Sequence, residues 1–213
     1  MERHTGGSLS YWLYTPEDTT SATPLIVYLH GGSGKGDDLD LLMEQDGFPK
    51  WLSEGRLGQV PAYVLIPQLP ADAKDWASAG TSVAGLIQEI AGTCPIDPAN
   101  ISLTGHSLGG TGTFALAQAY PDLFARIAPC SGSVRVTEES LSALADVSVW
   151  AFVGSADTVV PPQPSIHLVE SLSRTGDARL TELEGASHFD VPALVYLDRG
   201  AELIQWLTGG SPS

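Results

Sequence analysis

Residues 101–120 read ISLTGHSLGGTGTFALAQAY and place a strand, a sharp turn and a helix in direct succession. The first five residues, which include Ile101 and Leu103, are typical of a short strand, and the last twelve follow a helical pattern. The turn between them, GHSLG, matches the pattern G-x-S-x-G around Ser107. Such a turn strains the backbone at the serine and lifts its side chain above the end of the strand. A glycine-rich turn without chemistry fits the same five letters, so the interpretation depends on the rest of the sequence.

Apolar runs of strand length recur along the chain, at 8–15, 24–30, 62–68, 101–105, 126–130, 147–154 and 178–185. Most are continuous, which favours strands buried on both faces of a parallel sheet, whereas the first alternates and suits an antiparallel edge. Helical patterns separate them, at 82–92, 109–120, 139–146, 164–174 and 193–207. This alternation predicts an α/β fold of three layers, a mostly parallel sheet flanked by helices.

The composition is that of a folded globular chain. Of the 213 residues, 43% are hydrophobic and the mean hydropathy is +0.06, so we expect a packed core in a single domain over residues 1–213. Ten basic and 25 acidic residues give a formal net charge of −15. A field of that sign repels phosphate backbones and anionic lipids. Nucleic acid and membrane surfaces are therefore not expected as partners.

The N-terminal segment MERHTGGSLSYW lacks a basic region followed by an apolar run, and no stretch of the chain reaches the 18 apolar residues typical of a membrane span. We therefore expect no signal peptide and a cytoplasmic location. A secreted form would require that a leader had been removed from this N-terminus.

The two cysteines, Cys94 and Cys130, are expected at opposite edges of the sheet. A strand of about five residues is ~17 Å long, which is far beyond disulfide reach. We predict two free thiols. No cysteine and histidine cluster has zinc spacing. The serine-based mechanism expected at Ser107 implies neither a metal nor a cofactor.

A serine nucleophile needs a base, and the chain offers five histidines. His188 follows the last expected strand and precedes the last helix, so it is expected above the same sheet edge as Ser107. The other four histidines have less suitable positions. His4 belongs to the N-terminal segment, and His30 stands at a strand end. His106 is in the turn itself, where its side chain is expected to point away, and His167 is on a solvated helix face. We predict that His188 is the base.

The acid that orients this base is expected at the end of another strand. Asp157 follows the run at 147–154 and lies at the required edge, although it also fits a simple cap of the turn before two prolines. Asp190 would have to reach back within one loop, and Asp146 and Asp177 lie on the opposite side of the sheet. We predict that Asp157 is the acid.

The segment HGGSGKGDD, residues 30–38, follows the strand at 24–30. Its glycines allow a backbone N–H group to face a developing oxyanion. We predict that the N–H groups of Gly32 and Leu108 are the two donors, with Ser33 as the alternative to Gly32. The segment lacks the G-x-x-x-x-G-K-[ST] spacing of a phosphate-binding loop.

Together, PLIVYLHGG, GHSLGGTGT, FVGSAD and the later SH resemble the α/β-hydrolase superfamily from Tyr11 to Leu207. The likeness is to its small serine esterases, in the branch with dienelactone-hydrolase-like enzymes, feruloyl-esterase-like enzymes and phospholipase/carboxylesterases. The order Ser107, Asp157, His188 is the order of that superfamily. Serine at position 107 differs from the cysteine of true dienelactone hydrolases. The resemblance implies the α/β-hydrolase fold, a Ser-His-Asp triad and an acyl-enzyme.

The expected activity is hydrolysis of short-chain or aryl carboxylic esters, with a small-molecule ester as substrate. Three alternatives are a small prolyl-oligopeptidase-like peptidase, an acyl thioesterase, and a binding module on the same fold that lacks catalysis. The module would be expected to have lost a triad residue, and all three are present.

The substrate site is expected to be open. From Cys130 to Val147 the chain has about 17 residues with one short helix, which is too little for a cap domain. Phe189, beside His188, is a candidate for the pocket wall. Trp76 has two interpretations, a wall of the acyl or aryl pocket and an anchor that packs a long loop onto the body.

Overall fold

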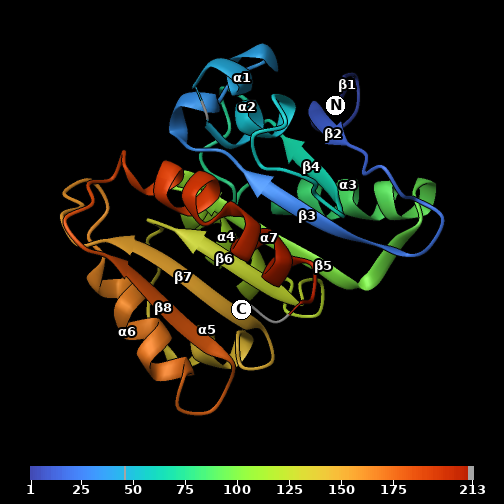
Figure 1. Cartoon of the computed structure of the whole chain (residues 1–213). Coiled ribbons are helices and arrows are strands. Elements are labelled where there is room, and N and C mark those ends of the chain that lie inside the picture. Colours follow the sequence, from blue (N-terminus) through green and yellow to red (C-terminus); the bar gives the residue numbers. More distant parts are fainter. Residues whose placement is uncertain (46, 211–213) are drawn as a thin grey trace.

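The computed structural model describes residues 1–45 and 47–210 and contains an eight-stranded sheet in the order β1-β2-β4-β3-β5-β6-β7-β8 (Figure 1). Strands β3 to β8 run parallel, while β1 and β2 are antiparallel to their neighbours. The strands are β1 (Glu2–His4), β2 (Tyr11–Tyr14), β3 (Thr23–Leu29), β4 (Tyr63–Pro67), β5 (Ile96–His106), β6 (Arg126–Cys130), β7 (Ser148–Gly154) and β8 (Ala178–Leu183).

Helices cover both faces of this sheet and complete the three layers (Figure 1). On one face, apolar side chains of α3 (Gly80–Thr93), α4 (Leu108–Ala119) and α6 (Gln163–Leu172) pack on the strands. The other face is covered by α1 (Asp40–Gln45), α2 (Gly47–Ser53), the π-helix η2 (Ala193–Asp198) and α7 (Gly200–Leu207). The predicted three-layer α/β architecture, a mostly parallel sheet flanked by helices, is confirmed.

The continuous apolar runs became the central strands because both of their faces are covered. All five residues of β4 are buried, and six of the seven residues of β3 are. Between β6 and β7 the described chain holds only the short helix α5 (Glu138–Ala143), and no separate cap domain is present there. Among residues 1–45 and 47–210, no helix has the length and apolar character that crossing a membrane requires.

Three details differ from the prediction. The edge strand β1 was not expected, because its residues are polar and it is held by backbone pairing with β2. Helices α1 and α2 were also missed. The expected helix over 193–207 is divided at Arg199 into η2 and α7, with a glycine, which is a poor helix former, as the first residue of α7.

Candidate active site

The turn at Ser107 joins β5 to α4 and is tightly packed against the end of β3. Ser107 has φ 59° and ψ −117°, a left-handed conformation that costs a non-glycine residue about 1–3 kcal/mol. A Cβ atom on Gly105 would lie 2.5 Å from the carbonyl oxygen of Leu29, and one on Gly109 would overlap the same oxygen. Glycine is therefore required at both positions, and the packed backbone holds Ser107 in its strained conformation.

Three side chains from three strand ends form a continuous hydrogen-bond chain. His188, in the loop after β8, has its Nε2 atom 2.8 Å from Ser107 Oγ and its Nδ1 atom 2.7 Å from Asp157 Oδ2. Because a carboxylate only accepts, Nδ1–H is the donor to Asp157, and Nε2 is left to accept from the serine hydroxyl. Asp157 and His188 are 6% and 4% exposed. The structure thus brings together the three residues that the sequence singled out.

Asp157 is held in its ionised form. Its Oδ1 atom accepts hydrogen bonds from the N–H groups of Val159 and Val160, both at 2.9 Å. Burial raises the pKa of this carboxyl, but the hydrogen bonds from Val160 and from the His188 ring outweigh burial and leave the pKa below its usual value. An ionised carboxylate at this place favours the Nδ1–H tautomer of His188.

His106 lies against His188, and the expectation that its side chain points away was wrong. Its Nε2–H group donates to the backbone carbonyl of His188 at 3.0 Å, and the two rings lie 4.6 Å apart. Burial, together with the positive charge that His188 can carry, lowers the pKa of His106 to about 4. A neutral His106 therefore supports the loop of His188, a contact that no spacing in the sequence predicts.

The loop after β3 lies beside the serine. A Cβ atom on Gly31 would be 3.7 Å from Ser107 Cβ, so the start of the short 3₁₀ helix η1 (Gly32–Gly34) adjoins the turn. Leu108 is the first residue of α4, where backbone N–H groups have no acceptor within the helix. The structure brings both predicted donor segments to Ser107. The assignment to Gly32, with Ser33 as the alternative, stays a prediction.

The His30 side chain holds this loop in place through two hydrogen bonds to backbone groups. Its Nδ1–H group donates to Gly31 O at 2.6 Å, and its Nε2 atom accepts from the N–H group of Leu69 at 2.9 Å. Burial lowers the pKa of His30 to about 4. This imidazole is neutral and joins two backbone segments, so it orders the loop and has no nitrogen left for proton transfer.

Trp76 is a loop anchor, and its proposed place in the pocket wall was wrong. The side chain is fully buried, and its Nε1–H group donates to His30 O at 3.1 Å. A Cβ atom on Gly112 of α4 would lie 2.5 Å from Trp76 Cβ, which shows how closely the tryptophan packs on that helix. Burial of so large an aromatic ring stabilises the fold more than a partly exposed position in a pocket wall would.

The cavity above Ser107 has a volume of about 460 Å³. Phe189 lines it as expected and is 79% exposed at its rim. Trp51 of α2 lines the cavity as well. This tryptophan was not predicted as a site residue, because no helix was expected over Gly47–Ser53.

Asp190 does not reach the base. Its carboxylate accepts from both the N–H and the hydroxyl group of Ser187, and it is exposed. The predicted free thiols are confirmed for both cysteines. Burial raises the pKa of Cys130 to about 12, so this thiol stays protonated and contributes no nucleophile.

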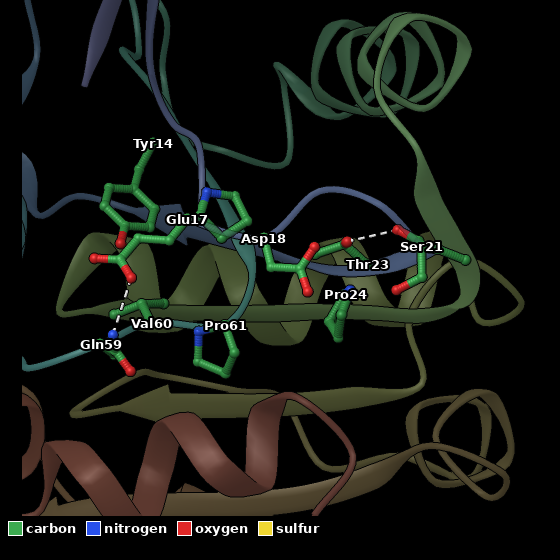
Figure 2. Close-up of a pocket in the computed structure, with 11 residues that line it drawn as sticks. Tyr14, Glu17, Asp18, Ser21, Thr23, Pro24, Gln59, Val60 and Pro61 are labelled. Atoms are coloured by element: carbon green, nitrogen blue, oxygen red, sulfur yellow. Dashed lines mark hydrogen bonds between the residues drawn. The ribbon is translucent and has the colours of Figure 1, made fainter.

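A second cavity, of about 300 Å³, lies at the other end of the strands and is shown in Figure 2. It surrounds Thr23, the first residue of β3, whereas Ser107 adjoins the last one. Its polar groups are already paired in part: Gln59 donates to Glu17 at 3.0 Å, and Thr23 donates to Ser21 O at 2.8 Å (Figure 2). The described residues that line it include no histidine or cysteine, and the Ser107 cavity stays the candidate active site.

Comparison with known proteins agrees with this geometry. The model of an esterase family, described as "Putative esterase", matches residues 74–182, about half of the chain. A poly(3-hydroxyalkanoate) depolymerase C from Paucimonas lemoignei is 26% identical over an alignment of 140 residues, and the match covers 59% of this chain and 32% of the depolymerase. The chain thus spans about a third of that relative.

Solved structures match over more of the chain. A thermostable esterase has a TM-score of 0.79 and 28% identity, with 93% of this chain and 58% of that chain covered. The feruloyl esterase module from Clostridium thermocellum, solved with sinapinate, has a TM-score of 0.67 and 17% identity over 92% of this chain and 86% of that chain, a likeness of fold. The chain therefore belongs to this esterase family and has the α/β-hydrolase fold.

Proposed function

We propose that the protein is a serine carboxylic-ester hydrolase that acts through Ser107, His188 and Asp157. The observation that carries the proposal is the hydrogen-bond chain from Ser107 Oγ through His188 to Asp157, with distances of 2.8 and 2.7 Å, at the base of an open cavity. Membership of the esterase family supports the same conclusion.

The first half of the reaction forms an acyl-enzyme. Ser107 Oγ attacks the ester carbonyl carbon while its proton passes to His188 Nε2, and the carbonyl electron pair moves onto the oxygen. The N–H groups of Leu108 and Gly32 stabilise this oxyanion, and Asp157 stabilises the imidazolium. The tetrahedral intermediate then collapses, the bond to the alcohol oxygen breaks, and Nε2–H gives that oxygen its proton.

The second half releases the acid. Water loses a proton to His188 Nε2 as its oxygen adds to the acyl carbon. The bond to Ser107 Oγ then breaks, and Oγ recovers the proton from Nε2. The chain's own residues supply every proton transfer in this cycle, so the mechanism requires no metal or cofactor.

Short-chain and aryl esters are the proposed substrates. The cavity is small, it is not covered by a cap domain in the described chain, and Phe189 and Trp51 give it aromatic surface. Aromatic rings favour flat apolar groups through their large contact area. Small soluble esters of this kind can enter directly, whereas long acyl chains would extend beyond the cavity.

The test is replacement of Ser107 by alanine, with p-nitrophenyl acetate as substrate. Because the three residues act as a unit, kcat/KM is expected to fall by at least about 10³-fold. A phosphonate reagent is expected to add covalently to the wild type and not to the variant, as measured by intact mass. Ser173→Ala, at an exposed serine after α6, is the matched control and should behave as wild type.

Residual activity above a few per cent in Ser107→Ala would contradict the proposal. The anilide and thioester analogues of the same acyl group are measured in parallel. A preference for the anilide would point to a peptidase, and a preference for the thioester to a thioesterase, with the same three residues in use.

A further inference from the structure

The cavity above Ser107 has two walls that come from different parts of the chain. One is formed by the loops after β7 and β8 and includes Val159, Phe189 and Pro192. The other comes from the end of α1 and from α2, and includes Gln45, Gly47 and Trp51. Ser107 lines the same cavity.

The wall with Phe189 borders the leaving alcohol. During acylation the alcohol oxygen must face His188 Nε2, because that atom gives it a proton. Phe189 follows His188 directly, and its ring packs edge-on against the imidazole with the centroids 5.5 Å apart. A group that departs next to His188 therefore passes Phe189.

The acyl group must take another direction. Around a tetrahedral carbon bound to Ser107 Oγ, the oxyanion faces the N–H groups and the alcohol faces His188, so the acyl substituent is directed to the remaining side. The α1–α2 wall belongs to the segment that follows the oxyanion loop, and Trp51 is its large apolar member.

Trp51 is fixed on the protein side and open on the cavity side. Its ring packs against the core of this face, and the guanidinium of Arg56 lies 6.0 Å from the ring centroid. The edge of the indole rests on Gly47: a Cβ atom there would be 2.5 Å from Trp51 Cη2 and 2.7 Å from Cζ2. Any side chain at position 47 would displace the ring, so the glycine and the tryptophan form one unit.

We propose that Trp51, seated on Gly47, is the acyl-side specificity determinant, and that Phe189 borders the alcohol side. The indole gives flat acyl groups, such as benzoyl, a surface on which to stack. This inference rests on the proposed function and assigns the two walls of its site to the two halves of the ester.

Two ester series test the assignment. The acyl series keeps p-nitrophenol and varies the acid from acetate through butyrate to benzoate, and the alcohol series keeps acetate and varies the alcohol from ethanol through phenol to 1-naphthol. For Trp51→Ala, the ratio of kcat/KM for benzoate to that for acetate is expected to fall about tenfold. Its ratios in the alcohol series should stay as in the wild type.

Phe189→Ala is the matched aromatic control and should give the reverse pattern, with changes in the alcohol series alone. Gly47→Ala keeps the indole but moves it, so it should also change the acyl ratios. Trp51→Phe keeps an aromatic surface and should retain most of the benzoate preference. If Trp51→Ala does not fold, Gly47→Ala still measures the effect of the indole on the acyl ratios.

The outcomes separate this inference from the proposed function. If wild-type protein hydrolyses these esters and Ser107→Ala does not, but Trp51→Ala and Gly47→Ala leave the acyl ratios unchanged or shift the alcohol ratios, the wall assignment is overturned and the esterase assignment stands. If the wild type hydrolyses none of the esters, the proposed function fails and this inference fails with it.

Discussion

The loops that follow β3 and β8 each carry a buried histidine, but the two imidazoles have different neighbours. Both nitrogens of His30 are engaged by backbone groups, at Gly31 and Leu69. Both nitrogens of His188 are engaged by side chains, Asp157 and Ser107, whose protons can move. The contrast teaches that burial alone does not make a histidine catalytic, since the function depends on what its two nitrogens face.

The largest expected effects come from replacing His188 and His30 one at a time, which should separate a loss of activity from a loss of stability. His188→Gln is expected to lower kcat/KM for p-nitrophenyl acetate by about 10³-fold or more, because the imidazole nitrogen that faces Ser107 Oγ is lost. His30→Gln should chiefly lower the free energy of unfolding, by about 1–3 kcal/mol, because buried backbone groups lose their partners. Steady-state kinetics and urea denaturation measure the two effects. Equal losses of activity in the two variants would remove the distinction.

The carboxylates of the β7 and β8 loops give the next largest contrast. Asp157→Asn should lower kcat by about 10³- to 10⁴-fold, because an amide no longer favours the required tautomer of the base. Asp190→Asn is the matched control, and its kcat should stay within about twofold of wild type, because Asp190 binds only Ser187 and lies at the surface. The reverse ranking would identify Asp190 as the acid.

Trp76 also supports the loop after β3, because its Nε1–H group donates a hydrogen bond to His30 O. Trp76→Ala removes a fully buried indole and should cost about 3–5 kcal/mol of unfolding free energy. Acyl selectivity should be unchanged in the protein that remains folded. Phe189→Ala, at an exposed ring, should leave the stability close to wild type. If Trp76→Ala instead changes the acyl selectivity without loss of stability, Trp76 is part of the pocket wall.

Stability should also depend on pH through the neutral histidines. The pKa of both His30 and His106 is lowered from 6.5 to about 4 in the folded protein, so the unfolded chain binds more protons between these values. Their contribution is therefore full above pH 6.5 and is lost as the pH falls toward 4. At pH 5, each of these two histidines is expected to lower the free energy of unfolding by about 2 kcal/mol relative to pH 8.

Urea denaturation at a series of pH values measures this loss. His30→Gln should remove about half of the pH dependence in this window, because it leaves only the His106 contribution. The lowered pKa of Asp157 acts at more acid pH, below its ordinary value of 3.8, and does not enter the same window. A flat stability profile from pH 8 to 5 would show that the two rings titrate normally.

The sequence by itself determined the features that depend on local pattern and chain order. Continuous apolar runs identified the parallel strands, since residues covered on both faces leave no polar alternation. Because the carboxyl ends of parallel strands share one edge of the sheet, chain order alone indicated that Ser107, Asp157 and His188 lie together, and they do. Their catalytic roles stay predictions until the variants are measured.

Only the tertiary structure decided which side chains from distant segments meet. The contact of His106 with His188, the burial of Trp76 under the loop of His30, and the place of Trp51 in the cavity wall all depend on how helices and loops settle on the sheet. Helix and strand periodicity relates only residues that are close together in the sequence. It therefore does not predict contacts between side chains from distant segments. Packing fixes them, because each ring takes the space that its neighbours leave.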